Sequence, residues 1–468
     1  MAYRTTNPAT GKVEKSFETI TDAALAAILD ETGRCYREDW PQRPIAERAA
    51  IIKRAAAIIR NEQQALAEVM SRDMGKLVPQ AIGELQLSAA ILDYYADTAA
   101  EFLKPKPLPG APGATLHPQP LGALLAVEPW NFPFFQLARV VGPQLMVGNV
   151  MVAKHASNVP QCALAFEDVM RRAGVPAGAY ANLFVSTDQI GTVIDDPRIR
   201  GVTLTGSEKA GATVAERAAR NLKKSVLELG GSDPMIVLED APVEATVYNA
   251  MVGKMNNTGQ SCVATKRMIV VGEERGRVFL EAMKAAMGAL QAGDPLDPAT
   301  TLGPVSSEGA LQGLLKQIEE AKAAGADVTL GGNRIDRQGS YLEATILTGI
   351  TKANPVYAQE IFGPVLSFYV VPDEAAAIAL ANDVPFGLGG SVFTADLERG
   401  ERVALAIESG MAFVNNPTWS TPQMPFGGIK NSGYGRELSQ LGFGEFVNWK
   451  LVAISPAGAL PPGADAAG

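Results

Sequence analysis

The segment 256–267, NNTGQSCVATKR, places one cysteine among glycine, serine and amide side chains. A core cysteine normally lies in an apolar, periodic run, whereas the small residues before Cys262 leave room for a substrate carbon to approach the sulfur. A cysteine thiolate is a nucleophile that forms covalent intermediates with carbonyl compounds. Cys262 is therefore a candidate catalytic nucleophile that needs a base and an oxyanion donor as partners.

The base must come from a short list of side chains, because the chain has only two histidines. His117 lies in a Pro-rich stretch and His155 directly follows a lysine, and neither has the spacing of a metal-binding cluster. No metal site is expected, and the expected base is a carboxylate. Glu228 in ELGGSDP (228–234) is the candidate, and a solvated acid in a turn is the alternative interpretation.

An amide that could hold an oxyanion occurs in AVEPWNFP (126–133). Pro129 and Pro133 stiffen the turn around Asn131, so its amide is positioned in advance, as an oxyanion donor must be. An Asn before a helix is also a common N-cap, and capping is the alternative function of Asn131.

The stretch TLTGSEKAG (203–211) has the pattern of a strand end, a Gly-Ser turn and a helix start. Exposed amides at such a helix N-terminus, with the Ser207 hydroxyl, could hold a pyrophosphate. The motif is not the G-x-G-x-x-G fingerprint, so a simple connecting turn is the alternative.

The elements that must position these residues follow a clear order. Residues 21–103 have the helical period of amphipathic helices, and the Pro-rich stretch 104–120 interrupts it as an extended excursion or linker. Apolar strand-like runs then alternate with helices, at 121–127, 149–154 and 200–206. This alternation predicts an α/β fold with a parallel, doubly wound sheet that binds ligands at the carboxyl ends of its strands.

A second series of strands and helices follows SVLELGG (225–231). The expected strands are PMIVLED, RMIVVGE, ATILTGI and VLSFYVV, with helices near 242–257, 275–291 and 374–382. This series predicts a second α/β domain that holds Cys262. The tail 456–468 is rich in Pro, Gly and Ala and is expected to be disordered.

Composition restricts the partners and the compartment. The formal net charge of −9 disfavours nucleic acid and anionic lipid, and no run of the 468-residue chain is long and apolar enough to span a bilayer. The N-terminus lacks the order of a signal peptide, so we expect a cytoplasmic protein. Cys35 and Cys162 lie in helical patterns and are assigned to packing. The chain has three cysteines, and this odd number does not suggest a disulfide framework.

Seven motifs, in this order and at these intervals, resemble the aldehyde dehydrogenase superfamily over about residues 5–455. They are EPWNFP (128–133), MVAK (151–154), TGS (205–207), ELGG (228–231), NTGQSC (257–262), QEIFGPV (359–365) and PFGGIKNSGYGRE (425–437).

The resemblance implies that the thiolate of Cys262 attacks an aldehyde to form a thiohemiacetal, which loses hydride to NAD(P) and becomes a thioester. Asn131 and the Cys262 N–H would hold the oxyanion, and Glu228 would activate the water that hydrolyses the thioester. The implied cofactor-binding residues are Trp130, Lys154, Ser157, Gly206, Ser207, Leu229, Glu360 and Phe362.

Members of the family that prefer NAD commonly place a glutamate three residues after the MVAK lysine, where this chain has Ser157. A serine hydroxyl can donate to a 2′-phosphate that a carboxylate would repel. NADP is therefore expected to be accepted and favoured over NAD.

The substrate expectation depends on Arg139, which follows Phe135 by four residues and shares its helix face. This spacing would place a guanidinium on the wall of the aldehyde tunnel, and an arginine paired with an acid at a domain interface is the alternative. The branch of the family that oxidises succinic semialdehyde uses an arginine at this position and serines at the positions of Ser261 and Ser420. Trp419 and Gln423 depart from the basic residues of that branch, so an aromatic or medium-chain aldehyde is the alternative substrate.

The resemblance also implies the domain organisation. A Rossmann-like dinucleotide-binding domain would comprise 1–103 and 121–228, a catalytic domain 229–438, and a small β oligomerisation element 104–120 and 439–455. A homodimer or homotetramer is expected. Three other functions are alternatives. Glu228 argues against an acylating enzyme that uses coenzyme A, and the nucleotide-contact motifs argue against a thiol esterase or amidase without a dinucleotide. The presence of Cys262 and Glu228 argues against a non-catalytic protein.

Overall fold

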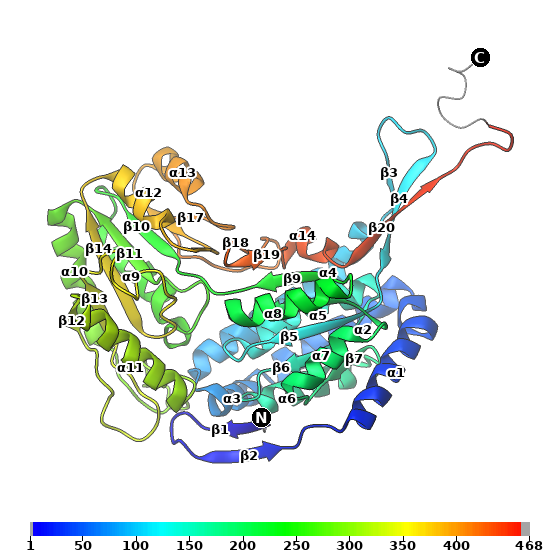
Figure 1. The fold of residues 1–468 in the computed structure, drawn as a ribbon, viewed down its shortest axis with the longest axis horizontal. Helices are drawn as coiled ribbons and strands as arrows, with labels where there is room; N and C mark the ends of the chain where they lie inside the picture. Colours follow the sequence, from blue (N-terminus) through cyan, green and yellow to red (C-terminus); the bar gives the residue numbers. More distant parts are fainter. Residues whose placement is uncertain (1–2, 460–468) are drawn as a thin grey trace.

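A six-stranded sheet forms the centre of one half of the computed structural model, which describes residues 3–459 (Figure 1). In spatial order its strands are β19 (Gly433–Tyr434), β9 (Lys224–Glu228), β8 (Ile199–Thr205), β5 (Ala123–Glu128), β6 (Val150–His155) and β7 (Tyr180–Asn182). The strands β5 to β9 are parallel, and β19 joins the edge antiparallel. Because β6 and β7 lie on one side of β5 and β8 and β9 on the other, the strand order reverses beside β5, which is where such sheets bind ligands.

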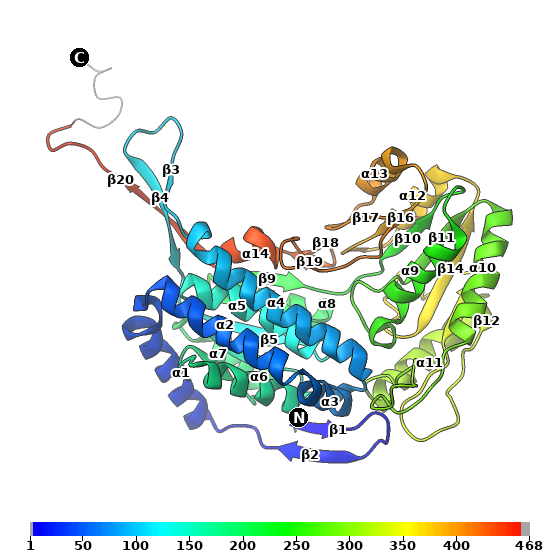
Figure 2. The ribbon, with the colours of Figure 1, turned by 180° about the vertical axis from the view of Figure 1, so that it is seen from behind.

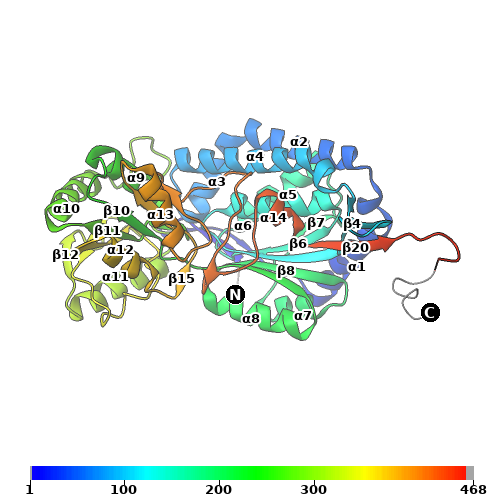
Figure 3. The ribbon, with the colours of Figure 1, turned by 90° about the horizontal axis from the view of Figure 1, so that it is seen from above.

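Helices cover both faces of this sheet. Figure 3 shows α2 and α4 on one side and α7 and α8 on the other. The helices of this half are α1 (Asp22–Glu38), the short η1 (Trp40–Gln42), α2 (Ile45–Asn61), α3 (Gln63–Met74), α4 (Val78–Phe102), α5 (Pro133–Val147), α6 (Pro160–Ala173), α7 (Thr187–Asp195) and α8 (Glu208–Arg220). An N-terminal hairpin, β1 (Tyr3–Thr6) and β2 (Val13–Phe17), lies beside α3.

A seven-stranded sheet forms the other half of the molecule, and its central strands are buried on both faces. Its spatial order is β12 (Asp327–Leu330), β13 (Thr345–Thr348), β14 (Val365–Val371), β11 (Arg267–Val271), β10 (Pro234–Val237), β16 (Ser391–Phe393) and β17 (Phe413–Val414). In β11, Met268 and Val270 pack in one apolar cluster, while Ile269 and Val271 pack in another. Alternate residues point to opposite faces, so an unbroken apolar run is the pattern that a doubly covered parallel sheet requires.

The helices around the second sheet are α9 (Val243–Met255), α10 (Glu273–Gly288), α11 (Glu308–Ala323), α12 (Glu374–Asn382) and α13 (Leu397–Ala406). A 3₁₀ turn, η2 (Asn256–Gly259), follows α9 and leads into the Cys262 segment. A two-stranded ribbon, β15 (Phe386–Gly387) with β18 (Ile429–Lys430), joins distant segments of this half.

A three-stranded arm extends away from both halves, as the views in Figures 1 and 2 show. It consists of β3 (Lys106–Pro107), β4 (Ala114–Pro120) and β20 (Val447–Ala453), with β20 at one edge. The extended excursion expected over 104–120 therefore contains a hairpin, which pairs with a strand from near the C-terminus.

Two of the expected domain boundaries need correction. The pair 433–434, placed in the catalytic domain by the sequence, forms β19 and pairs with β9 of the first sheet, with Gly433 opposite Glu228. The helix α14 (Ser439–Gly444), placed in the oligomerisation element, packs on the first half instead. Phe443 of α14 is buried and stacks on Tyr95, and this contact explains why the short helix packs on the first half rather than on the arm.

The α/β fold predicted from the alternation of strands and helices is confirmed, including the strand runs at 121–127, 149–154 and 200–206. The N-terminal hairpin, α7, α11, α13 and several strands of two to four residues were not anticipated. Short elements carry little periodicity, but this reason does not apply to α11, which spans 16 residues. Most of the tail 456–468, expected to be disordered, lies outside the described residues. No helix within residues 3–459 is long and apolar enough to cross a membrane.

Candidate active site

The Cys262 segment begins with an unusual backbone. Asn257 and Thr258 have φ values of 54° and 55°, and Gly259 follows with φ 74°. Left-handed conformations are costly for residues with a Cβ, and at position 259 a Cβ would collide with the Gly363 carbonyl group. Surrounding contacts must therefore hold this segment in shape.

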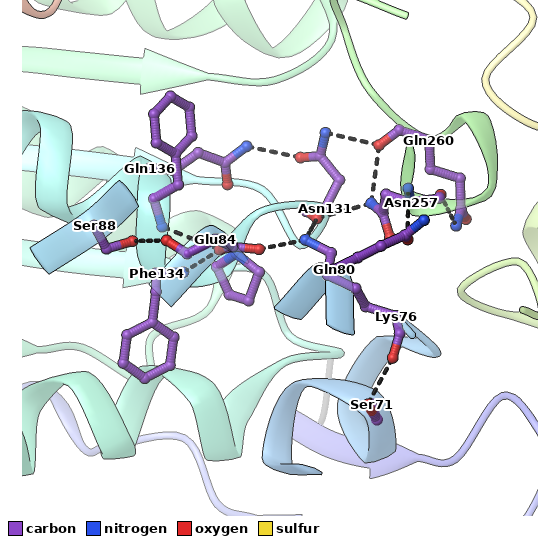
Figure 4. Close-up of polar contacts among 12 residues, drawn as sticks. Ser71, Lys76, Gln80, Glu84, Ser88, Asn131, Phe134, Gln136, Asn257 and Gln260 are labelled. Atoms are coloured by element: carbon purple, nitrogen blue, oxygen red, sulfur yellow. Dashed lines mark hydrogen bonds and ion pairs between the residues drawn. The ribbon is translucent and has the colours of Figure 1, made fainter. Parts of the chain in front are cut away.

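The side chain of Asn257 supplies part of that support (Figure 4). Its Nδ2 donates to the backbone oxygens of Asn131 at 2.8 Å and Gln260 at 3.1 Å, and its backbone N–H donates to Oε1 of Gln80 at 2.9 Å. Gln260 is itself held because its Oε1 accepts the N–H of Ser306 at 2.8 Å. These bonds tie the Cys262 segment to the turn that carries Asn131.

Asn131 lies directly after the first sheet, in the turn between β5 and α5, and its side chain is aimed at the Cys262 segment. Its Nδ2 donates to the backbone oxygen of Gln260 at 3.1 Å. An amide nitrogen carries two hydrogens, so one fixes the orientation of the group and the other can donate to a reacting oxygen. The capping alternative is not what the structure shows, because no side-chain cap hydrogen bond is formed at the N-terminus of α5, where the N-cap residue is Phe132.

A buried ion pair supports the turn that carries Asn131 (Figure 4). The Lys76 ammonium pairs with Glu84, and both side chains are almost fully buried. Lys76 Nζ also donates to the Asn131 backbone oxygen at 2.8 Å and lies 3.7 Å from the centre of the Phe132 ring. Glu84 Oε1 accepts the N–H of Phe134 at 2.8 Å, so this carboxylate serves as the acceptor at the N-terminus of α5.

Cys262 differs from the other two cysteines because it is partly exposed, whereas Cys35 and Cys162 are buried. Burial of the sulfur raises the pKa of the Cys262 thiol to about 12, while the positive charges of Arg139 and Lys266 oppose this shift. The assignment of Cys35 and Cys162 to packing agrees with their burial in the apolar core of the first half.

Glu228 is the last residue of β9 and is 1% exposed. Its carboxylate has no hydrogen-bond partner among residues 3–459, and a Cβ at Gly427 would lie 2.7 Å from its Oε1. Burial raises its pKa well above the ordinary range, and the nearby acid Glu437 adds to the effect. A buried carboxylate without partners stands out against the rule that buried polar groups are bonded, and it is free to bind a water molecule or a substrate group.

Arg139 shares a face with Phe135, as its spacing predicted, and its guanidinium lies 5.0 Å from that ring and 4.6 Å from the Phe426 ring. The side chain is 1% exposed, forms an ion pair with Glu437 and donates to Thr205 Oγ1 at 3.0 Å. The guanidinium is thus paired with an acid from a distant segment, as the alternative interpretation expected, and its contact with a substrate stays a prediction.

Three buried acids surround this single guanidinium: Glu128, Glu228 and Glu437. Burial raises the pKa of each, and the charge of Arg139 opposes the rise in each case. One cation cannot stabilise three carboxylates at once, so the carboxyl groups of this cluster bind protons more readily than isolated acids do.

The other two residues expected to contact the substrate occupy different surroundings. Ser261 is buried directly before Cys262, and its backbone oxygen accepts from Lys266 Nζ at 2.8 Å. Ser420 is half-buried in the segment after Thr418, whose hydroxyl donates to Asp233 at 3.0 Å. Trp419 beside it is half exposed.

The residues expected to bind a dinucleotide gather at the carboxyl edge of the first sheet. Lys154 is near the end of β6, Ser157 follows that strand, and Ser207 caps the N-terminus of α8 by accepting from Ala210 N–H at 3.3 Å. The first N–H groups of a helix have no partner within it and suit a pyrophosphate. Lys154 is partly buried, and burial lowers its pKa.

Gly206 and Leu229 complete the part of this edge beside β9. The N–H of Gly206 donates to the Glu228 backbone oxygen at 2.9 Å, and the N–H of Leu229 donates to the Ser432 oxygen at 3.0 Å. The Leu229 side chain fills the space beside Gly211, where a Cβ would lie 2.6 Å from it. This packing holds the turn before α8 close to the first sheet.

Trp130, Phe362 and Glu360 lie between this edge and the Cys262 segment. The rings of Trp130 and Phe362 meet edge to face with centres 5.8 Å apart. Glu360 Oε1 accepts the N–H of Gly231 at 3.1 Å and pairs with Lys266 at 3.0 Å. A carboxylate held in this way can still accept hydroxyl groups of a ribose, because it offers about four lone-pair sites.

Neither histidine reaches the thiol. His155 is buried, its Nε2 lies 3.0 Å from the Pro133 oxygen, and burial lowers its pKa to about 4. His117 is on β4 of the arm. The described residues contain no group of three or more His, Cys, Asp or Glu side chains arranged to hold a metal ion.

Sequence reasoning missed Lys76, Glu84, Asn257, Lys266 and Glu437. Two of them lay inside quoted motifs, Asn257 in NTGQSC and Glu437 in PFGGIKNSGYGRE, and were not assigned a contact. Lys76 and Glu84 belong to an amphipathic helical region that was interpreted as packing. Lys266 directly precedes an apolar strand, and this position in the sequence was a signal that its side chain is buried.

Comparison with known proteins gives a consistent result over almost the whole chain. The model of the aldehyde dehydrogenase family matches residues 1–452. A succinate-semialdehyde dehydrogenase [NADP(+)] of Deinococcus radiodurans is 46% identical over 461 residues, which cover 98% of this chain and 96% of the relative. A probable succinate-semialdehyde dehydrogenase [NADP(+)] of Synechocystis sp. is 44% identical over 97% of this chain and 100% of the relative.

The fold is also similar to that of a solved structure. The crystal structure of succinic semialdehyde dehydrogenase from Streptococcus pyogenes, in complex with NADP⁺ as the cofactor, superposes with a TM-score of 0.95 at 46% sequence identity. The similarity covers 97% of this chain and 100% of that one.

Proposed function

The chain belongs to the aldehyde dehydrogenase family, and from this premise we propose that it oxidises succinic semialdehyde to succinate with NADP as the hydride acceptor. The observation that carries the chemistry is twofold: the Asn131 amide is tied to the Cys262 segment, and Arg139 interacts with the charges of both Cys262 and Glu228, whose carboxylate has no hydrogen-bond partner within residues 3–459. The near-full-length relatives named for this semialdehyde and for NADP⁺ support the substrate and the cofactor.

The reaction begins when the Cys262 thiolate attacks the aldehyde carbon and the carbonyl oxygen becomes an oxyanion. The second Asn131 N–H and the Cys262 backbone N–H stabilise this oxyanion, and preorganised donors of this kind are worth about 10²–10³ in rate each. Because the Asn131 amide is fixed by its bond to the Gln260 oxygen, it needs no reorientation during the attack.

A bound NADP would supply the hydride acceptor for the thiohemiacetal carbon, and Cys262 would then carry a thioester. Trp130 and Phe362 flank the nicotinamide site, Glu360 holds the adjoining ribose, and Ser207 with the α8 N-terminus binds the pyrophosphate. Lys154 and Ser157 bind the adenosine ribose and its 2′-phosphate. The fit is supported by the position of these groups at the point where the strand order reverses.

Glu228 completes the cycle by taking a proton from water as the water attacks the thioester. Succinate leaves with one oxygen from that water, Cys262 is released as a thiolate, and the proton taken by Glu228 is returned to solvent before the next cycle. A positioned general base contributes about 10²–10⁴-fold to such a step.

Arg139 is proposed to bind the distal carboxylate of the substrate, with Ser261 and Ser420 as further donors and Phe135 as the apolar wall. A guanidinium has five N–H donors, so it can serve a substrate carboxylate while it keeps a bond to Glu437. The existing ion pair weakens this anchor, and that observation favours an aromatic or medium-chain aldehyde as the second candidate substrate.

A steady-state panel tests the substrate, with succinic semialdehyde, butanal, octanal and benzaldehyde measured against NADP and NAD. The proposal expects the highest kcat/KM for succinic semialdehyde with NADP, and a preference for benzaldehyde would overturn it. The variant Arg139→Met combined with Glu437→Gln removes the cation together with its ion-pair partner. It should raise KM for the semialdehyde far more than KM for butanal, and Glu437→Gln alone is the matched control.

The arm is proposed to form a homodimer, or a homotetramer from two such dimers, in the cytoplasm. β20 is an edge strand, and its exposed apolar side chains include Trp449 and Leu451. An exposed apolar edge strand is a template for pairing with another chain. Light scattering after size exclusion should give a multiple of the 49.3 kDa chain mass, and Leu451→Lys should lower it.

A further inference from the structure

Lys266 is a buried lysine that contacts both functional parts of the site. It directly precedes β11, is 3% exposed, and its backbone N–H donates to the Asp233 oxygen at 3.1 Å. Its Nζ donates to the backbone oxygens of Cys262 at 2.6 Å and Ser261 at 2.8 Å, and it pairs with Glu360 Oε1 at 3.0 Å.

These three contacts use the whole donor capacity of the side chain. An ammonium group has three N–H bonds and no acceptor, so each hydrogen has one partner. A buried charge is tolerated when it is paired and hydrogen-bonded in this way. The Lys266 head group is therefore fixed in position rather than sampling several rotamers.

The partners of Lys266 come from two separate segments. The oxygens of Ser261 and Cys262 belong to the nucleophile segment, whereas Glu360 precedes β14 and faces the proposed ribose site. Glu360 is confined on its other side, because its Oε1 accepts the Gly231 N–H at 3.1 Å and a Cβ at Gly230 would lie 2.6 Å from Oε2.

We propose that Lys266 is a positioning residue that sets the Cys262 segment and Glu360 at a fixed separation and stabilises the Cys262 thiolate by its charge. The proposal rests on the proposed roles of Cys262 and Glu360. Attack by sulfur and hydride transfer occur at the same substrate carbon, so the nucleophile and the nicotinamide must be held at matching positions on either side of it.

The charge of Lys266 has a predictable sign at the sulfur. Lys266 opposes the burial that raises the pKa of the Cys262 thiol, whereas Glu360 adds to the rise. Loss of the lysine should make the thiol less reactive, and loss of the Glu360 charge should make it more reactive. A residue that only supports the fold would lower reactivity in both variants.

Lys254 provides a matched control within the same half of the molecule. It is fully buried near the C-terminal end of α9, its Nζ has no hydrogen-bond partner among the described residues, and burial lowers its pKa well below the ordinary value. Lys254→Met therefore removes a buried lysine without removing a tie to the Cys262 segment.

The test measures alkylation of Cys262 by iodoacetamide in the full-length protein, without substrate or cofactor, over a range of pH. Lys266→Met should move the pH midpoint of alkylation upward and slow alkylation about tenfold at a fixed pH below the midpoint, since one pKa unit changes the thiolate fraction tenfold. Glu360→Gln should speed alkylation, and Lys254→Met should leave the midpoint in place. Peptide mass spectrometry assigns the modified cysteine.

A second readout reports the tie to the cofactor site. The Kd for NADP, measured by protein fluorescence, should rise in Lys266→Met and in Glu360→Gln. The fold rise in Kd of the double variant should be clearly smaller than the product of the two single rises. Where Lys266→Met does not fold, Lys266→Gln and Glu360→Gln carry the same comparison.

Unchanged alkylation in Lys266→Met, slower alkylation in Glu360→Gln, or additive effects on Kd would overturn the proposal. Because alkylation needs neither aldehyde nor turnover, a chain that fails to oxidise succinic semialdehyde but shows these shifts would refute the proposed substrate and leave the role of Lys266 standing.

Discussion

Replacing Lys76 by methionine should lower both stability and turnover, for separable reasons. The change removes the partner of buried Glu84 and the Nζ donor that lies 2.8 Å from the Asn131 oxygen. Breaking a buried ion pair by removing one partner costs about 3–5 kcal/mol. A displacement of the Asn131 turn by about 1 Å would lower kcat by up to about 10²-fold, since the oxyanion donor would no longer be aligned.

A double variant separates the two effects. In Lys76→Met with Glu84→Gln no buried charge is left unpaired, and the glutamine oxygen can still accept the N–H of Phe134. Most of the lost stability should return, whereas kcat should stay low because the Asn131 oxygen still lacks its donor. Lys53→Met is the control: it breaks an exposed ion pair with Asp97, and exposed pairs of this kind contribute little to stability.

Stability is measured by urea unfolding, and turnover by the absorbance of NADPH under saturating succinic semialdehyde. Alkylation of Cys262 by iodoacetamide should be nearly unchanged in the double variant, since the thiol itself is not altered. If the double variant regained full kcat along with its stability, the ion pair would serve the fold alone and the positioning argument for Asn131 would be refuted.

Two further predictions concern the cofactor and pH. Ser157→Glu should lower kcat/KM for NADP by at least about tenfold and shift the preference toward NAD, because a carboxylate repels the 2′-phosphate. Parallel titrations with both cofactors measure this preference, and a wild type active only with NAD would contradict the assignment. Thioester hydrolysis should speed up as pH rises, because burial raises the pKa of Glu228 and only its deprotonated form is a base. The steady-state rate that follows a pre-steady-state burst measures this hydrolysis. The same dependence of that rate on pH in Glu228→Gln would count against the role of Glu228.

The sequence was sufficient to predict that Glu228 and Asn131 lie at the ends of strands, whereas their roles in the reaction stay predictions. Glu228 and Asn131 follow apolar runs that form parallel strands, and the carboxyl ends of such strands meet at one edge. Cys262 was identifiable because small and amide residues replace an apolar period before it. The two-sheet α/β fold followed from the same alternation.

The contacts that hold these residues could not be predicted in the same way. The pairing of Arg139 with Glu437 joins α5 to a segment that follows the second sheet, and no local period links such distant positions. The tie between Lys266 and Glu360 is of the same kind. The left-handed backbone at Asn257 and Thr258 depends on tertiary contacts, because the β-branched Thr258 strongly disfavours that region.

The assignment of Cys262 and Glu228 is tested most directly by a single measurement on Glu228→Gln. Mixed with succinic semialdehyde and NADP, this variant should release a burst of NADPH equal to its active sites and then stall, because water attack on the thioester lacks its base. Intact-protein and peptide mass spectrometry of the stalled enzyme should find a succinyl group on Cys262, and Cys262→Ala should give neither burst nor adduct. An adduct on Cys35 or Cys162, or steady turnover by Cys262→Ala, would contradict the account.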